Sequence, residues 1–298
     1  MPTLLIVGCG DVARRALPAL VGRWNVLALA RKEHEVAELR AHGVRPVRGD
    51  LDCAASLSRL SGLADALLYT APPPGSGERD LRLRRLLSAL AKAKSIPQRL
   101  IYISTSGVYG DAGGGRVDEC TPVRPASDRA RRRLDAERSL RAFAIRHGVS
   151  LTILRAPGIY AAERLPLETV WARRGQLRGE EDSYSNHIHA DDLARLCVRA
   201  LRRHGGIRIF NACDDESTRI GDWYDLLADA CGVERAPRFS RDALRTQLSP
   251  LQWSFLAESR RLDNTRLRRE LGLRLQWPTV RAFVAAHGAW LAKAARIR

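Results

Sequence analysis

Two glycines near the start of the chain are spaced so that the backbone could bind a phosphate group. They belong to the sequence Gly8-x-Gly10-x-x-Ala13, which follows the apolar run Leu4–Val7 and precedes a helical pattern over residues 14–20. The first glycine permits a tight turn, the second lets a phosphate approach the backbone, and the alanine keeps the helix close to its strand. Because the free N–H groups of a helix N-terminus attract anions, the sequence predicts a loop that binds the pyrophosphate of a dinucleotide.

A basic residue stands where such a site usually selects its dinucleotide. About 20 residues past the glycines, an acidic residue would bind the ribose 2′-hydroxyl of NAD. This chain has Arg31 there, followed by Lys32. A guanidinium can pair with a 2′-phosphate through two hydrogen bonds, so the sequence favours NADP over NAD. The alternative is that Arg31 is one of many surface arginines. Asp50, after the third predicted strand, is interpreted as an acceptor for the adenine amino group or as a simple turn residue.

Strand-like and helical segments alternate along the first two thirds of the chain. This alternation is typical of an α/β, doubly wound parallel sheet of the Rossmann type, which binds its ligands at the carboxyl ends of the strands. Strands are predicted at 4–7, 25–30, 44–47, 65–70, 99–104, 150–155 and 207–212, with helices at 14–20, 33–42, 55–60, 80–94, 129–147 and 191–203.

The remaining segments are less regular and more helical. Residues 161–298, mainly 161–186 and 213–298, are expected to form a smaller, mostly helical C-terminal lobe that binds the substrate. The dinucleotide-binding domain is predicted to span residues 1–160 and to be completed by residues 187–212.

Composition limits the class of protein. The 298 residues are 45% hydrophobic and 28% charged, which is ordinary for a globular protein. No apolar run reaches the roughly 18 residues of a membrane helix, and the scattered cysteines favour reduced thiols. We therefore predict a cytoplasmic protein without contact to a membrane. The net charge of +17 comes almost entirely from arginines spread along the chain. No basic stretch is interleaved with aromatic residues, which favours a solvated basic surface over specific binding of nucleic acid.

Further motifs resemble the extended short-chain dehydrogenase/reductases of the NAD(P)-dependent epimerase/dehydratase type over nearly the whole chain. The usual Gly-x-x-Gly-x-x-Gly of that family is shortened here. In order, the motifs are the glycine loop, Arg31, Gly49-Asp50-Leu51, Thr70-Ala71-Pro72-Pro73, and residues 102–111, 118–125, 154–160, 186–194 and 210–211. The resemblance and the loop together predict these cofactor-binding residues: Gly8, Gly10, Asp11, Val12, Ala13, Arg31, Lys32, Asp50, Leu51, Thr70, Ala71 and Pro72.

The active-site helix departs from that family. The family has a Tyr and, four residues on, a Lys; alignment on Ala136-Glu137 places Arg129 and Arg133 at these positions. The lysine lowers the pKa of the phenol so that it exchanges a proton with the substrate, whereas a guanidinium stays protonated. The chain in this respect resembles atypical subgroups of the family, above all the bacterial YeeZ-like proteins, and this resemblance implies no known substrate.

The two arginines share one helix face, because they are four residues apart. They could bind a phosphate or carboxylate and stabilise negative charge on a substrate oxygen; the alternative is a solvated helix surface. Thr105 stands where the family has a Ser or Thr that hydrogen-bonds the substrate oxygen. Thr105, Arg129 and Arg133 are the candidate catalytic residues. The proton would come from solvent or from another side chain, with Tyr109, Tyr160, Tyr184 and His187 available.

The sequence His187-x-His189, close to Asp191-Asp192, could suggest a metal site. The family resemblance instead implies a structural turn here that leads into a helix capped by the Asp. We predict no metal.

The leading hypothesis is an NADP-binding oxidoreductase or epimerase-like enzyme that acts on a small molecule, with an anionic substrate as one alternative. A second hypothesis is a non-catalytic regulator that senses NADP(H). A third, based on charge alone, is a nucleic-acid binder. A homodimer through helices 80–94 and 129–147 stays open, because both carry many arginines.

Overall fold

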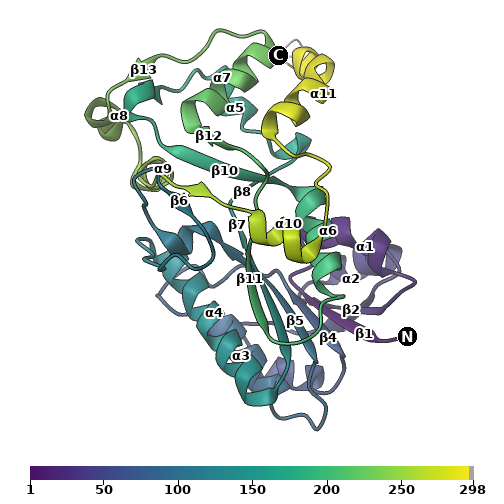
Figure 1. Cartoon of the computed structure of the whole chain (residues 1–298). Coiled ribbons are helices and arrows are strands. Elements are labelled where there is room, and N and C mark those ends of the chain that lie inside the picture. Colours follow the sequence, from purple (N-terminus) through teal and green to yellow (C-terminus); the bar gives the residue numbers. More distant parts are fainter. Residues whose placement is uncertain (295–298) are drawn as a thin grey trace.

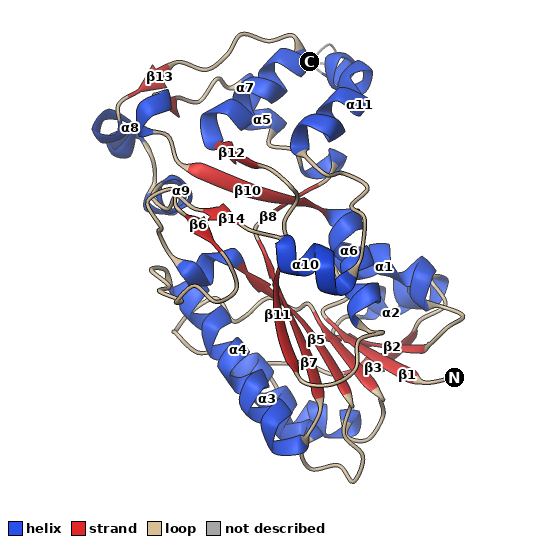
Figure 2. Cartoon of the chain, in the orientation of Figure 1, coloured by secondary structure: helices blue, strands red, loops and turns tan. Residues whose placement is uncertain are grey.

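The computed structural model describes residues 1–294, and its central feature is a seven-stranded parallel sheet (Figures 1 and 2). The strand order is β11-β7-β5-β4-β1-β2-β3, so the chain builds outward from β1 in one direction and then in the other. This is the predicted doubly wound Rossmann sheet. Its strands are β1 (Thr3–Val7), β2 (Asn25–Ala30), β3 (Arg45–Arg48), β4 (Ala66–Tyr69), β5 (Arg99–Thr105), β7 (Ser150–Ala156) and β11 (Ile207–Asn211).

The strands are apolar on both sides because helices cover both faces of the sheet. Leu4 and Ile6 of β1 face one apolar core, while Leu5 and Val7 face the other, and all four side chains are fully buried. The first core contains α1 (Asp11–Leu20), α2 (Glu33–Ala41), α6 (Ala190–Ala200) and α10 (Thr265–Leu271); the second contains η1 (Ala54–Leu60), α3 (Leu81–Leu90) and α4 (Asp128–His147).

Helix α4 positions both candidate arginines in its first turns. Ser127 caps the helix, since its Oγ accepts a hydrogen bond from Ala130 N, and the helix ends at Gly148 in the left-handed conformation. Ala130 packs beside Gly107, directly after β5. The start of α4 therefore lies at the carboxyl ends of the strands, where a Rossmann sheet binds its ligands.

A smaller lobe lies beyond these strand ends (Figure 1). Its apolar core forms around Tyr160, Trp223 and Phe283. The lobe contains α5 (Leu167–Trp171), α7 (Ile220–Cys231), α8 (Arg241–Gln247), α9 (Pro250–Leu256) and α11 (Val280–Ala294), with β8 (Gly158–Tyr160), β9 (Gln176–Leu177), β10 (Tyr184–His189), β12 (Ser217–Arg219) and β13 (Arg238–Phe239). Short elements beside them are η2 (Ser106–Tyr109), η3 (Ala162–Arg164), η4 (Gly179–Glu181), β6 (Arg116–Val117) and β14 (Arg261–Leu262).

The chain returns from the lobe to the sheet through α10. Leu267, Leu271 and Leu275 are buried in the first core, together with Phe210 of β11 and the apolar face of α6. Late residues thus complete the core of the first half. The division of the chain at residue 160 stays a prediction.

Two expectations for residues 187–192 were wrong. These residues do not begin with a turn, because His187 and His189 belong to β10, which pairs with β8 on one side and β12 on the other. Helix α6 is capped by His189, whose Nδ1 accepts a hydrogen bond from Asp191 N, and not by an Asp. The ladder partners of β10 lie far away in the sequence, so the local pattern did not reveal the strand. Within residues 1–294, no helix is both long and apolar enough to span a membrane.

Candidate functional site

A cleft of about 380 Å³ lies at the carboxyl ends of β1, β2 and β4. The order of strands reverses between β1 and β4, which is where Rossmann sheets bind dinucleotides. The structure brings together eight of the predicted cofactor residues along this cleft: Gly8, Gly10, Arg31, Asp50, Leu51, Thr70, Ala71 and Pro72.

The turn at Gly8 fits the predicted role of the glycine loop. Gly8 has φ +92°, and a Cβ there would lie only 2.4 Å from the backbone N of Ala71. Thr70 holds the turn, since its Oγ1 donates a hydrogen bond to Gly8 O. At Gly10, by contrast, a Cβ would meet nothing closer than Gly8 O at 4.0 Å. The backbone at Gly10 therefore faces open space through which a phosphate could approach.

The next three predicted residues do not line the cleft with their side chains. Val12 and Ala13 are buried in the apolar core. The Asp11 carboxylate accepts hydrogen bonds from Arg15 and Arg164. These residues can reach a ligand only through the backbone at the N-terminus of α1, whose free N–H groups favour an anion.

The end of the cleft that contains Arg31 also contains an acidic residue, Glu35. Glu35 lines the cleft beside Arg31, and its Oε2 accepts hydrogen bonds from Arg31 N at 2.7 Å and Lys32 N at 2.9 Å. Burial acts to raise the Glu35 pKa, but these hydrogen bonds outweigh it and lower the pKa. Lys32 itself is not among the residues that line the cleft. Glu35 caps the start of α2 from within its first turn, a local pattern that sequence analysis could have recognised.

Asp50 fits both roles considered for it. It lines the cleft, and its Oδ1 accepts a hydrogen bond from Asp52 N, as in a turn.

Sequence analysis also missed two arginines of the cleft. Arg14 donates from Nε to Cys9 O, and Arg82 forms a two-bond ion pair with Asp52.

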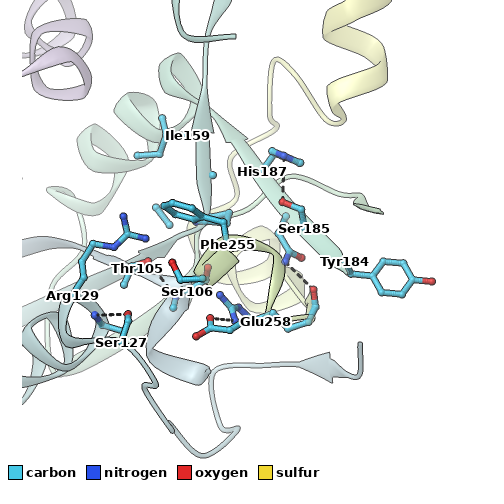
Figure 3. Close-up of a pocket in the computed structure, with 18 of the residues that line it drawn as sticks. Thr105, Ser106, Ser127, Arg129, Ile159, Tyr184, Ser185, His187, Phe255 and Glu258 are labelled. Carbon is cyan, nitrogen blue, oxygen red and sulfur yellow. Dashed lines mark hydrogen bonds and ion pairs between the residues drawn. The ribbon is translucent and has the colours of Figure 1, made fainter. Parts of the chain in front are cut away.

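A second cavity of about 530 Å³ lies between the sheet and the lobe (Figure 3). It is lined by all three candidate catalytic residues, Thr105, Arg129 and Arg133. Residues of β10, α7 and α9 complete its walls, notably Tyr184, Ser185, His187, Trp223 and Phe255, with Glu258 and Arg260 after α9.

Arg133 lies on the boundary between the two cavities. Its Nη1 donates to Ile103 O at 3.1 Å, to the Tyr102 hydroxyl at 3.2 Å and to Ala71 O at 3.4 Å. Ala71 lines the cofactor cleft, while Ile103 lines the second cavity. Through these hydrogen bonds Arg133 links the segment after β4 to β5.

Arg129 points into the cavity and has no ion-pair partner among residues 1–294 (Figure 3). Its guanidinium lies 5.0 Å from the centre of the Phe255 ring, and Glu258 attracts it only from beyond ion-pair distance. Although the residue as a whole is exposed, the surrounding protein and, next, repulsion from Arg133 lower the Arg129 pKa. A partly desolvated cation without an ion-pair partner in a cavity favours an anionic ligand.

Thr105 keeps its hydroxyl proton available. Its Oγ1 accepts a hydrogen bond from Gly107 N at 3.2 Å, so the O–H is free to donate to a ligand oxygen.

Two of the four alternative residues for proton transfer, Tyr109 and Tyr160, are buried outside the cavity. The Tyr109 hydroxyl donates to Asn211 Oδ1, and burial raises its pKa to about 12. The Tyr160 hydroxyl is enclosed in the core of the lobe, where burial likewise raises its pKa. Neither side chain lines the cavity. Tyr184 and His187 do line it.

A buried polar network beneath the cavity was not recognised in the sequence. Glu137 of α4 accepts hydrogen bonds from Ser104 Oγ at 2.6 Å and from Arg155 Nε and Nη2 at 3.1 and 2.7 Å. Arg155 in turn lies over the ring of Tyr109. The network ties α4 to β5 and β7, and so fixes the helix that carries Arg129 and Arg133. Its members come from motifs in three parts of the chain, and only the fold brings them together.

The predicted absence of a metal site stays a prediction. In the described part of the chain, no three side chains of His, Cys, Asp or Glu are grouped as metal ligands would be.

Comparisons with known proteins agree with this arrangement. Residues 8–204 match the sequence model of a family described as NAD(P)H-binding. The chain is 28% identical over 286 residues to protein YeeZ of Escherichia coli K12, an alignment that covers 93% of this chain and 97% of that protein.

Solved structures share the fold over their whole length. A functionally unknown conserved protein from Silicibacter pomeroyi has a TM-score of 0.77 at 28% identity, with 97% of this chain and 99% of that one covered. UDP-glucuronic acid 4-epimerase from Bacillus cereus, solved in complex with NAD, has a TM-score of 0.75 at 18% identity, with 99% and 98% covered. The epimerase/dehydratase-like fold expected from the motifs is thereby confirmed.

Proposed function

The chain belongs to the NAD(P)H-binding family, and from this premise we propose that it is an NADP-dependent oxidoreductase with a non-standard active site. The position of Arg133 carries this proposal. Its guanidinium donates hydrogen bonds both to Ala71 on the cofactor cleft and to Ile103 in the second cavity. A dinucleotide in the cleft and a small molecule in the cavity would therefore lie on the two sides of one side chain.

The cleft fits the cofactor, because Gly8 makes a turn that only glycine can adopt there and Gly10 leaves open space beside it. The N–H groups at the start of α1 would hold the pyrophosphate, and Arg31 the 2′-phosphate. Asp50 would accept from the adenine amino group. When bound, the nicotinamide supplies or accepts the hydride.

In the second cavity, Thr105 and Arg129 would have different roles toward the substrate. Thr105 would donate its hydroxyl proton as a hydrogen bond to the substrate oxygen. Arg129 would bind an anionic group of the substrate and stabilise negative charge that develops on that oxygen. Neither Arg129 nor Arg133 can transfer a proton, because a guanidinium stays protonated at working pH. The proton must pass through another group.

Replacing Arg31 with methionine is expected to remove the preference for NADP. Calorimetric titration with NADPH, NADP, NADH and NAD should show wild-type protein binding the phosphorylated pair more tightly. The variant should lose roughly tenfold or more in affinity for that pair, since a charge-assisted hydrogen bond contributes about 1.5–3 kcal/mol. Its affinity for NADH and NAD should stay the same.

The control is Arg45→Met, which removes the same charge from an exposed position at the start of β3. Equal losses of affinity for NADP and NADPH in both variants would show that the effect comes from the overall positive charge and not from a contact with Arg31. Tighter binding of NADH than of NADPH by wild-type protein would contradict the proposed role of Arg31. It would indicate instead that Glu35 binds the ribose 2′-hydroxyl.

Replacing Arg129 with methionine tests the proposed anionic substrate. Oxalate and inorganic phosphate serve as probes, titrated into protein saturated with NADP. We expect the Arg129→Met variant to bind the better probe at least about tenfold more weakly than wild type. Arg131→Met is the matched control, because Arg131 belongs to the same helix but pairs with Asp128 on the surface. Unchanged probe affinity in Arg129→Met would contradict the proposal.

The loss of the Tyr/Lys pair supports a second candidate function. Two guanidiniums without proton-transfer chemistry at those positions would suit a regulator that binds NADP(H) and reports its redox state to a partner. Such a protein should bind NADP and NADPH with clearly different affinities and turn neither over with any substrate. NADPH oxidation at enzyme-like rates would exclude this second function.

A further inference from the structure

One titratable side chain in the second cavity has the position that proton transfer requires. Tyr109 and Tyr160 are enclosed elsewhere, as described above. The Tyr184 ring lies between the guanidiniums of Arg219 and Arg261, 5.6 and 5.1 Å from its centre, and points away from the other labelled side chains (Figure 3). His187 is left as the group in the cavity whose ring nitrogens can accept and release a proton.

His187 is held firmly against the wall of the cavity. It belongs to β10 and is paired with Gly158 of β8, at which a Cβ would come within 3.3 Å of the imidazole ring. The Trp223 ring covers it, with the ring centres 5.1 Å apart. Only 6% of the residue is exposed. The absence of a side chain at 158 therefore makes room for the imidazole.

The two nitrogens of the imidazole have different surroundings. Nε2 lies 3.4 Å from the hydroxyl oxygen of Ser185, which also lines the cavity (Figure 3). Nδ1 is buried, and no group in the described part of the chain hydrogen-bonds to it. Ser185 precedes His187 by two residues on a strand, so both side chains face the same side. The serine hydroxyl and the imidazole therefore both line the cavity, side by side.

Several charged and titratable groups surround the imidazole, but it is burial that keeps it neutral. Tyr160 on β8, Tyr224 on α7 and Asp214 after β11 belong to the elements packed against it, while Arg129, Glu258 and Arg260 line the same cavity. Burial lowers the pKa of His187 to about 4. At neutral pH the ring is thus neutral, and Nε2 can accept a proton in the tautomer that carries its hydrogen on Nδ1.

We propose that Ser185 and His187 form the proton relay of the oxidation step, with the serine hydroxyl touching the substrate and the imidazole receiving the proton. This inference rests on the function proposed above. As the substrate carbon gives up its hydride with the bonding pair to the dinucleotide, the substrate hydroxyl proton moves to Ser185 Oγ. The hydroxyl proton of Ser185 moves at the same time to His187 Nε2. The products are a carbonyl, the reduced dinucleotide and an imidazolium, so protons and electrons balance.

The charge balance of this step suits a buried site. With a dinucleotide bound, the imidazole would be neutral while the nicotinamide is oxidised and would become the cation as the nicotinamide is reduced. Together the two groups would carry one positive charge before and after the step. A buried site therefore pays no desolvation cost for a second charge. The two groups would therefore be coupled, because the oxidised cofactor would disfavour the imidazolium and the reduced cofactor would not.

That coupling can be measured without knowing the substrate. We would record histidine ring NMR signals against pH for the full chain saturated with NADP and then with NADPH. The His187 signal is assigned by its loss in His187→Gln, and again by its change in Ser185→Ala, so the assignment does not depend on one variant. A unit charge at close range shifts a buried pKa by about one unit or more. We expect the His187 pKa to be higher by that amount with NADPH than with NADP.

Exposed His204, after α6 at the opposite end of the sheet, is the internal control and should titrate identically in both complexes. Equal His187 pKa values in the two complexes, with both cofactors shown to bind by calorimetry, would overturn the relay while leaving the proposed function intact. If calorimetry shows no binding of either cofactor, the proposed function fails, and the relay fails with it. A pKa difference between the two complexes that is found for His187 but not for His204, and that is smaller in Ser185→Ala, supports the relay.

Discussion

A Gly8→Ala variant is expected to unfold at a lower denaturant concentration than wild type and to bind no dinucleotide. The left-handed conformation at φ +92° costs an alanine about 1–2 kcal/mol. Its Cβ would also lie 2.4 Å from Ala71 N, a backbone atom that can move away only if the end of β4 shifts. Relief of such overpacking costs about 1–3 kcal/mol more. Urea unfolding should therefore show a loss of about 3 kcal/mol, and calorimetry should show no binding.

Gly10→Ala separates the binding effect from the folding effect. A Cβ at Gly10 fits the protein, so stability should stay near that of wild type, whereas the added methyl occupies the space through which a phosphate approaches. Cofactor affinity should fall at least about tenfold. Gly75→Ala is the control in a nearby loop, where a Cβ meets nothing within 4 Å. Wild-type affinity in Gly10→Ala would mean that the pyrophosphate lies elsewhere.

Replacing Arg155 with leucine is expected to destabilise the protein more than any surface change. The carboxylate of Glu137 is 1% exposed, and Arg155 supplies two of its hydrogen bonds. Without that partner a buried charge is left with the single donor Ser104, which costs about 3–5 kcal/mol. Urea unfolding measures this loss. The exposed pair of Arg131 and Asp128 gives the control, because Arg131→Leu should cost less than about 1 kcal/mol.

The double variant Arg155→Leu/Glu137→Leu completes the test. A buried ion pair replaced by apolar residues of similar size is often close to neutral, so the second change should restore much of the stability lost in the first. Additive losses in the double variant would instead assign the cost to packing against Tyr109 and not to the uncompensated charge.

Local sequence signals predicted those features that depend on neighbouring residues. The apolar run before Gly8 gave the first strand, and the glycine spacing gave the turn and the helix after it. The regular alternation of such runs was sufficient for the sheet, because the central strands are buried on both faces and are therefore mostly apolar. The cofactor cleft followed from the sheet, since parallel strands end at a common edge.

Features that depend on distant residues could not be predicted in the same way. Strand β10 is defined by its ladders to β8 and β12, and its polar sequence gives no sign of them. Glu35 was missed because the prediction rested on Arg31 and Lys32 directly after β2, whereas the Glu35 side chain folds back to the backbone of both residues. The isolation of Arg129 depends on where α9 places Phe255, more than 100 residues away in the sequence.

The burial of α10 in the first core has a consequence for synthesis on the ribosome. Leu267, Leu271 and Leu275 cover apolar surface of α6 and β11, which are complete by residue 211. Until the chain has been extended past residue 275, that surface has no partner and is open to unwanted association. The nascent dinucleotide-binding half is therefore expected to need protection by chaperones, and to reach its native state only after residue 275 has emerged.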